Sequence, residues 1–235
     1  MKLPVLQYQK LHLETNDSDT VTVNDFQDQL SMLKENGFNP ITCNELYNYI
    51  MKEGNLPSKP VLITFDEGYI SQYEHAAPVL KKTGFHAVFF VTASTSLKSC
   101  YPQNDVSYSY MNIEQLKQLQ QQGFEIGLQG YDCLNFSQST PEIIRYDLQH
   151  AIALFEKLNL PIIKALAYPG GLRWQWFWKV RKMYKVLQEQ KIVLAFTKGS
   201  RTNELSTMHQ FHIYRIPING KLKEKDFIHL LKKYN

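Results

Sequence analysis

Short apolar runs alternate along the chain with stretches whose apolar residues repeat every three or four positions. The run VLITF at residues 61–65 is typical of a buried strand, whereas Phe26, Leu30 and Leu33 recur at helical spacing ahead of Gly37. The two patterns predict strands at residues 3–8, 38–42, 61–65, 85–91, 124–128, 164–168, 192–197 and 214–218. They predict helices at residues 23–36, 44–53, 71–83, 112–122, 141–158, 174–190 and 223–233. Residues 94–110 show neither pattern, and we expect them to form a long surface loop.

Strands that alternate with helices through short connections indicate a parallel sheet with crossover helices. Seven or eight such units in 235 residues favour a closed or nearly closed barrel over an open doubly wound sheet. No internal repeat, low-complexity tract or linker interrupts the pattern, so we expect residues 1–235 to form a single α/β domain. In such barrels the functional groups gather where the strands end.

Composition narrows the class of protein. Apolar residues make up 43% of the chain and charged residues 20%, as in a soluble globular protein. The net charge is +4, and the basic segment at residues 173–191 fits a solvated helix face better than a nucleic-acid site. We find no transmembrane segment and no signal-peptide pattern at the N-terminus. As written, the chain is therefore expected to be cytoplasmic, or secreted or in the cell envelope if a signal was removed.

The residues that follow the predicted strands are the candidates for chemistry: Tyr8-Gln9, Asp66-Glu67, residues 129–133, residues 168–170 and the region of Arg215. With their neighbours they form five motifs: PVLQYQ at residues 4–9, LITFDEG at 62–68, EIGLQGYDCLN at 125–135, LAYPGG at 166–171 and YRIPI at 214–218. In order and spacing these resemble the motifs of the polysaccharide deacetylases with a NodB-type homology domain, a family of carbohydrate esterases. Within that family, the chain is similar to the poly-N-acetylglucosamine deacetylases.

The resemblance implies a distorted (β/α) barrel of about seven parallel strands and a metal-dependent N- or O-deacetylase. It places Asp66 at the position of the general base. It places Glu67, Gln129 and Cys133 at the positions of the ligands to a divalent metal such as Zn, Co or Ni. Gly170 stands in the turn that helps to hold the oxyanion in the family.

Three of the family's histidines are replaced together, by Gln9, Gln129 and Cys133. An amide oxygen is a poor zinc ligand, and Cys133 fits a buried free cysteine better than a zinc thiolate. We therefore predict a catalytically impaired or saccharide-binding homologue that holds no cofactor, with Asp66 and Glu67 engaged by hydrogen bonds or cationic neighbours. Two alternatives stay open. One is an active deacetylase with an atypical metal site of Glu67, Gln129 and Cys133, and the other is a non-enzymatic interaction protein.

Residues near the strand ends are candidates for a groove that binds a saccharide or polysaccharide: Gln9, Tyr131, Tyr168, Gly170 and Trp174. On a helix at residues 174–190, Trp174 and Trp178 would share a face and Trp176 would point away. Flat sugar faces pack on indole rings, although tryptophans that anchor a helix to the barrel are commoner. We expect no nucleic-acid partner.

Overall fold

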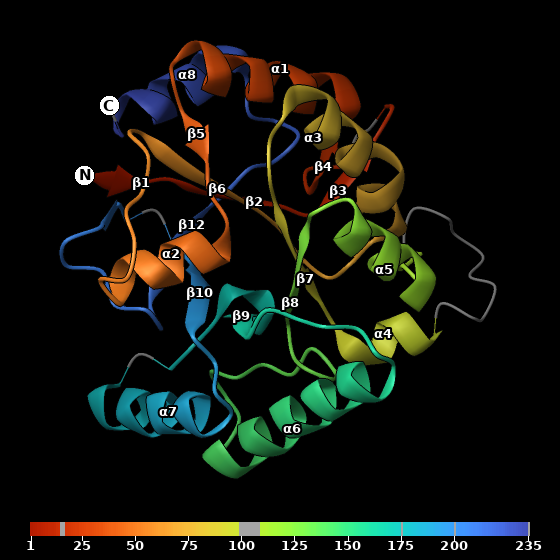
Figure 1. Ribbon diagram of the computed structural model, residues 1–235, viewed down its shortest axis with the longest axis vertical. Helices are drawn as coiled ribbons and strands as arrows, with labels where there is room; N and C mark the ends of the chain where they lie inside the picture. The colour runs from red at the N-terminus through yellow and green to blue at the C-terminus, as the bar shows by residue number, and fades with distance from the viewer. Residues whose placement is uncertain (15–16, 99–108, 175, 200, 235) are drawn as a thin grey trace.

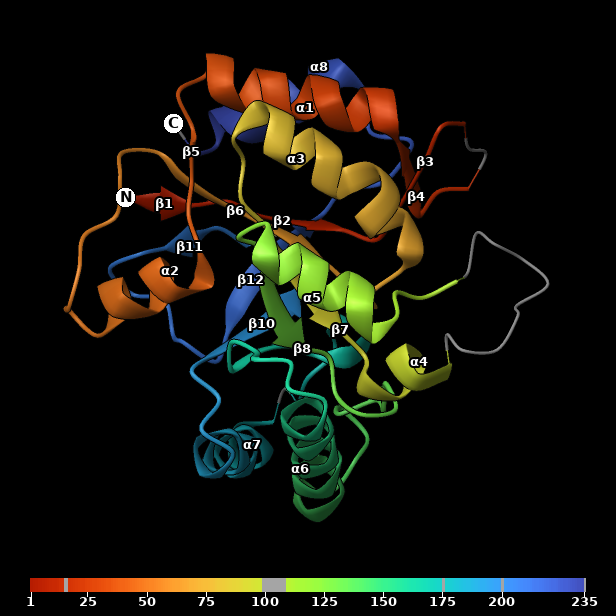
Figure 2. The same ribbon diagram turned by 45° about the vertical axis from the view of Figure 1, so that its right-hand side comes forward.

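The computed structural model describes residues 1–14, 17–98, 109–174, 176–199 and 201–234, and their arrangement is drawn in Figure 1 and Figure 2. The strands are β1 (Lys2–Leu3), β2 (Val5–Tyr8), β3 (Lys10–His12), β4 (Thr20–Thr22), β5 (Asn39–Pro40), β6 (Pro60–Phe65), β7 (Val88–Val91), β8 (Glu125–Leu128), β9 (Ala165–Ala167), β10 (Leu194–Lys198), β11 (Asn203–Glu204) and β12 (Ile213–Pro217). The helices are α1 (Val23–Glu35), α2 (Cys43–Ile50), α3 (Ala77–Thr83), α4 (Ala93–Lys98), α5 (Ile113–Gln121), α6 (Pro141–Lys157), α7 (Phe177–Glu189) and α8 (Glu224–Lys232). A π-helical turn at Gln72–Ala76 leads into α3, and a 3₁₀ turn at Pro169–Gly171 follows β9.

Seven parallel strands close into a barrel in the order β2-β12-β10-β9-β8-β7-β6, and β6 pairs again with β2. In the closing pair Tyr8 lies beside Phe65, and on the other side of β2 Leu6 lies beside Ile216 of β12. The short strand β5 pairs with the start of β6. The expected α/β barrel of about seven parallel strands is confirmed.

Side chains of the barrel strands alternate between the barrel interior and the surrounding helices, because successive residues of a strand face opposite ways. In β6, Leu62 joins an apolar cluster to which β2, β7, β9, β10 and β12 also contribute. Ile63 and Phe65 join a larger cluster that includes the helices. Thr64 and Asp66 share the parity of Leu62, so Asp66 points into the barrel mouth at the C-terminal end of β6.

Helices surround the barrel, and local signals set where they begin. Thr42 caps α2 in a reciprocal capping box with Glu45, and Thr140 caps α6 ahead of Pro141. In Figure 1, α1 and α8 lie together at one edge of the molecule, and α6 lies beside α7 at the opposite edge. The candidate site lies at the C-terminal ends of the barrel strands.

Most predicted elements are found within a few residues of their predicted limits, but the tryptophan segment differs. The backbone is extended at Leu172 and Trp176, so α7 begins at Phe177 rather than at residue 174. Trp174 is buried, whereas Trp176 and Trp178 are exposed. The prediction that Trp174 and Trp178 share a helical face is therefore wrong.

Two further differences concern segments between the barrel strands. The expected loop at residues 94–110 starts inside α4, and its part at residues 99–108 lies outside the described residues. The parallel pair of β3 and β4 was not predicted, because each strand has only three residues. Neither difference moves a barrel strand.

Candidate active site

Asp66 forms a buried ion pair with Arg215 of β12. The Arg215 guanidinium donates to both carboxylate oxygens, with Nη2 2.9 Å from Oδ2, and the side-chain amide of Gln7 in β2 donates to Oδ2 at 2.5 Å. Arg215 is 0% exposed and Asp66 is 2% exposed. Because β6, β2 and β12 are consecutive around the barrel, their side chains meet at its mouth. The buried carboxylate is thus compensated by a charged, bidentate partner.

The chain beyond Asp66 is fixed by Gln72, which is fully buried in the π-helical turn before α3. Its side-chain amide donates to the carbonyl oxygens of Asp66, at 2.6 Å, and of Gln9, at 2.7 Å. Gln9 is therefore tied to the same strand end through its backbone carbonyl. One glutamine side chain holds the ends of β2 and β6 together.

Glu67 and Gln129 are joined by a hydrogen bond between strand ends. Gln129 follows β8 and is buried, and its Oε1 accepts from the Glu67 backbone N–H at 2.6 Å. Glu67 has a φ of +71°, which is uncommon for a residue other than glycine. Its carboxylate accepts a hydrogen bond from the Tyr69 hydroxyl at 2.6 Å. Burial raises the pKa of the Glu67 carboxyl and the Asp66 charge adds to this, while the Tyr69 hydrogen bond opposes it.

Cys133 lies in the loop after β8, which Asp147 of α6 holds in place. The Asp147 carboxylate accepts hydrogen bonds from the backbone N–H groups of Tyr131, at 2.8 Å, and Asp132, at 3.2 Å. The loop carries Cys133 to the surface with a φ of +55°, so the expectation of a buried cysteine is wrong. Partial desolvation of the thiol, and then the Glu67 carboxylate, raise its pKa to about 11.

The residues at the family's metal positions offer a carboxylate, an amide oxygen and a thiol. The Gln129 side-chain oxygen accepts the Glu67 N–H, and an amide oxygen is a weak ligand for zinc, cobalt or nickel. Across the described ranges, no group of three or more His, Cys, Asp or Glu side chains is placed to hold a metal ion. Glu67, Gln129 and Cys133 do come together, but as a hydrogen-bonded cluster next to a free thiol.

The groove candidates after β9 occupy different environments. Tyr168 is fully buried, and its hydroxyl donates to the Phe211 carbonyl oxygen at 3.0 Å. Trp174 is also buried, with the Lys179 ammonium 5.9 Å from its ring centroid. Gly170 is exposed in the turn after β9 with a φ of +63°. Of these three, Gly170 alone presents its surface beside the strand ends.

Tyr131 lines a pocket of about 540 Å³ that is formed by residues on both sides of Cys133. The Tyr131 and His150 rings meet edge to face with centroids 6.0 Å apart, and the exposed Tyr146 ring lies 3.8 Å from His150. Leu134 adds an apolar wall. Apolar rings with a few polar groups around them are typical of ligand sites.

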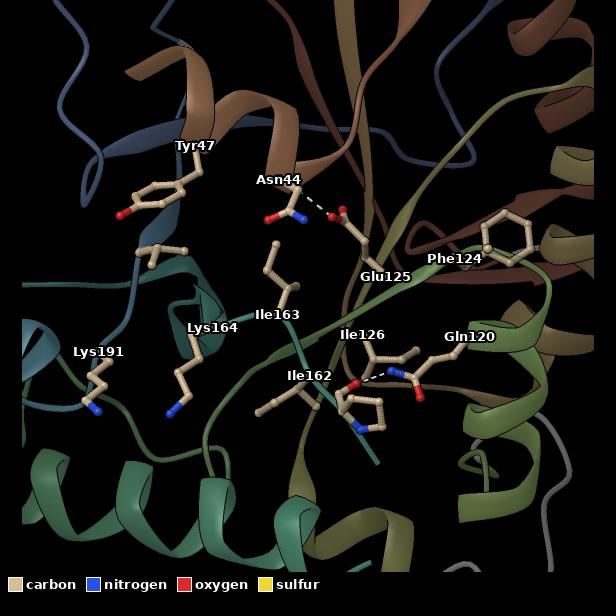
Figure 3. A pocket seen from close by; sticks show the side chains of 13 residues that line it. Asn44, Tyr47, Gln120, Phe124, Glu125, Ile126, Ile162, Ile163, Lys164 and Lys191 are labelled. Atoms are coloured by element: carbon tan, nitrogen blue, oxygen red, sulfur yellow. Dashed lines mark hydrogen bonds between the residues drawn. The ribbon is translucent and has the colours of Figure 1, made fainter. Parts of the chain in front are cut away.

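A second pocket, of about 580 Å³, lies at the opposite end of the barrel (Figure 3). It is lined by residues at the starts of β8, β9 and β10, among them Glu125, Lys164 and Val193. The Glu125 carboxylate accepts the backbone N–H groups of Cys43, at 2.7 Å, and Asn44, at 3.2 Å, and so caps α2. None of the strand-end candidates lines this pocket, so pocket size alone does not locate the site.

Sequence reasoning assigned no role to Gln7 or to Gln72, and it noted Arg215 only by its place at a strand end. The available signal was a polar side chain inside an apolar strand. Arg215 stands between Tyr214 and Ile216 in a predicted buried strand, and a buried arginine requires an anionic partner. The partner itself could not be read from the sequence.

The barrel and its strand-end cluster define an α/β protein whose candidate site lies at the C-terminal ends of parallel strands. The family model described as Polysaccharide deacetylase matches residues 53–189. The chain therefore belongs to the polysaccharide deacetylase family.

Two curated relatives illustrate the similarity. The chain is 29% identical over 170 residues to a Bacillus subtilis protein named as a polysaccharide deacetylase, YxkH, and the match covers 72% of this chain and 57% of that protein. It is 25% identical over 166 residues to the poly-beta-1,6-N-acetyl-D-glucosamine N-deacetylase of Staphylococcus epidermidis, with coverage of 65% and 54%. The chain thus spans little more than half the length of these relatives.

Solved structures share the fold. The Streptococcus pyogenes deacetylase PplD, in complex with acetate, superposes with a TM-score of 0.82 at 21% identity over 98% of both chains. IcaB from Ammonifex degensii superposes with a TM-score of 0.79 at 22% identity, over 99% of this chain and 96% of that one. At these identities the likeness is one of fold.

Proposed function

We propose that this member of the polysaccharide deacetylase family binds a saccharide without hydrolysing it through a bound metal ion. The observation that carries the proposal is the hydrogen bond from the Glu67 N–H to Gln129 Oε1. At a ligand position of the family, this bond turns the Gln129 amide oxygen toward a backbone N–H, and an amide oxygen is a weaker ligand for zinc, cobalt or nickel than an imidazole. The neighbouring ligand position holds Cys133, an exposed thiol, where the family has an imidazole.

The engagement of Asp66 supports the same proposal. A general base needs a lone pair within hydrogen-bond reach of the water it activates. The Asp66 carboxylate is buried and accepts three hydrogen bonds, two from Arg215 and one from Gln7. In our proposal Asp66 serves as the anionic partner of Arg215 and not as a base.

The ligand that we propose is a hexosamine polymer. Members of the family are named for polysaccharide substrates, and the Staphylococcus epidermidis relative is named for poly-beta-1,6-N-acetyl-D-glucosamine. The Tyr131 pocket offers rings on which a sugar face can pack. Gln9 and Gly170 would extend this groove along the strand ends within one domain of residues 1–235.

Metal content tests the first half of the proposal. The purified chain and a Gln129→His/Cys133→His variant are dialysed against zinc, cobalt or nickel and examined by elemental analysis, beside an assay for released acetate. We expect the native chain to retain no metal and the variant to retain about one ion per molecule, because imidazole restores two strong donors. A stoichiometric metal with acetate release by the native chain would instead establish the atypical site of Glu67, Gln129 and Cys133.

Calorimetric titration with β-1,6-linked N-acetylglucosamine oligomers tests the second half. We expect Tyr131→Ala to weaken binding about tenfold, since a stacked ring contributes on the order of 1 kcal/mol or more. Tyr47→Ala is the matched control, because Tyr47 lines the pocket at the opposite end of the barrel. If the native chain did not bind the saccharide, the result would instead favour the alternative that the chain is a non-enzymatic interaction protein.

A further inference from the structure

A group of basic and aromatic side chains lies on the outer wall of the barrel, where β10 and β12 are neighbours (Figure 1). Ile213 and Arg215 of β12 are buried in the barrel, so the alternate residues His212 and Tyr214 face outward. The connection from β10 to β12 is fixed against this wall by Asn203. Its Nδ2 donates to the Tyr214 carbonyl oxygen at 2.7 Å, and its Oδ1 accepts the Tyr214 N–H at 2.8 Å. The outward side chains are therefore held on a fixed backbone.

Arg173 brings a guanidinium group against this wall. It lies in the extended segment between the turn after β9 and α7, and its Nη1 donates to the Trp174 carbonyl oxygen at 2.8 Å. Its Nη2 lies 3.0 Å from Nδ1 and 2.5 Å from Nε2 of His212. A guanidinium group only donates, so His212 accepts with one ring nitrogen and keeps a proton on the other. The remaining N–H groups of Arg173 have no acceptor in this contact.

His209 adds a second imidazole. The Phe211 backbone N–H donates to His209 Nδ1 at 3.0 Å, so the neutral ring carries its proton on Nε2. The ring stacks on Tyr184 of α7, with the centroids 4.6 Å apart. His209 is exposed and His212 is half-buried. The stacked position presents the Nε2 proton of His209 as a further donor.

Arg201 completes the group as a second guanidinium. It is exposed, and its guanidinium carbon lies 5.8 Å from the centroid of the Tyr214 ring, which in turn lies 4.6 Å from the His212 ring. In the ranges that the structure describes, neither Arg173 nor Arg201 forms an ion pair with a carboxylate. Burial, and then these cationic neighbours, lower the pKa of His212 to about 4. The positive charge of the group is therefore not compensated by an acid, and a bound anion would compensate it.

We propose that this basic cluster binds the phosphate group of a phosphate monoester. The cluster consists of Arg173, Arg201, His209 and His212. Guanidinium forks match the oxygens of a phosphate, and charge-assisted hydrogen bonds to them are stronger than neutral ones. A phosphate offers three acceptor oxygens and nearly two negative charges near pH 7, whereas a carboxylate offers two oxygens and one charge. The Tyr184 and Tyr214 rings beside the cluster can contact the organic part of the ester.

This inference does not depend on the proposed saccharide binding, because the cluster shares no residue with the pocket that Tyr131 lines. Nuclear magnetic resonance of the histidine rings tests it on the full chain. The isotope-labelled protein is titrated with acid in chloride and in phosphate of equal ionic strength. In phosphate the pKa of His212 should rise by about one pH unit, which means that the imidazolium form binds phosphate about tenfold more tightly than the neutral ring. His229, exposed on α8, is the internal control and should titrate identically in both solutions.

Variants and a second ligand sharpen the test. Arg201→Gln should weaken phosphate binding at pH 6.5 about tenfold, since it removes a charge-assisted partner from an exposed position. Arg173→Gln should raise the pKa of His212 in chloride and remove its response to phosphate. Arg145→Gln, which removes an arginine paired with Glu189 on α6, is the matched control and should respond as the native chain does. Circular dichroism should be unchanged in all three variants.

Phenyl phosphate distinguishes two sources of the phosphate group. Tighter binding of phenyl phosphate than of inorganic phosphate would assign the site to a phosphate on an organic group, and equal binding would assign it to free phosphate. Unchanged titration of His212 and His209 in phosphate overturns the proposal. So does an equal response of His229, an equal effect of acetate, or an equal response of the Arg201→Gln and Arg145→Gln variants.

Discussion

The pair of Asp66 and Arg215 allows a quantitative test of how the barrel mouth is stabilised. In Arg215→Met the apolar side chain fills most of the arginine's space but leaves the Asp66 carboxylate buried without its charged partner, with only Gln7 donating to it. Removal of one member of a buried ion pair costs about 3–5 kcal/mol. For a chain of 235 residues, each kcal/mol lowers the melting temperature by about 2–4 °C, so we expect a loss of about 6–20 °C. Urea unfolding followed by circular dichroism gives the free energy directly.

An exposed ion pair of the same chemistry provides the control. Arg145 and Glu189 lie 2.9 Å apart on the partly exposed surfaces of α6 and α7, so Arg145→Met should cost less than about 1 kcal/mol. Asp66→Leu/Arg215→Met removes both buried charges and should recover part of the stability that Arg215→Met loses. If Arg215→Met cost no more than Arg145→Met, the reasoning that Asp66 is engaged by a buried counter-ion would be refuted.

Two further predictions concern the loop after β8 and a half-buried histidine. Gly130 has a φ of +90°, and a Cβ there would lie 2.5 Å from Asp147 Oδ2, so Gly130→Ala should destabilise the fold by about 2–4 kcal/mol in urea unfolding. Gly84→Ala, at a φ of +75° with nothing within 4 Å, should cost only about 1 kcal/mol, and equal effects would contradict the clash. Burial, and then the Arg173 guanidinium, lower the pKa of His212 to about 4. A lowered histidine pKa means that stability is fully present above about pH 6.5 and is lost as the pH falls toward 4. His212→Gln should therefore lose less stability than the native chain between about pH 7 and pH 5, and parallel losses would show that His212 does not carry this dependence.

The barrel could be predicted from the sequence because its signals are local. The run at Pro60–Phe65 is apolar except at Thr64, as is typical of a strand packed between a barrel core and helices, and Gly84 ends the helix before the next strand in a left-handed conformation. The start of α7 was missed, because the apolar spacing of Trp174 and Trp178 imitates a helical turn. The backbone between them is extended at Trp176, which only the packing of Trp174 reveals.

The positions of the candidate-site residues could be predicted from the sequence, but their hydrogen-bond and ion-pair partners could not. The order of strand ends brings Asp66, Glu67 and Gln129 into the barrel mouth, and the motifs located all three. The partners of these residues depend on contacts between strands far apart in sequence, such as Arg215 with Asp66. The orientation of a side chain could not be predicted either, because an amide at position 129 can face a metal ion or a backbone N–H. The structure directs Gln129 Oε1 toward Glu67.

The pairing of β2 with both β6 and β12 has a consequence for synthesis on the ribosome. β12 is the last of the seven barrel strands in chain order, so a nascent chain that lacks residues 213–217 has two open strand edges, on β2 and β10. Arg215 arrives with that same strand, and until then Asp66 has no guanidinium partner. Closure of the hydrogen-bonded ring and compensation of the buried charge are therefore completed in one late step. A contact between such distant residues slows folding, and it makes premature collapse of the open sheet an aggregation hazard.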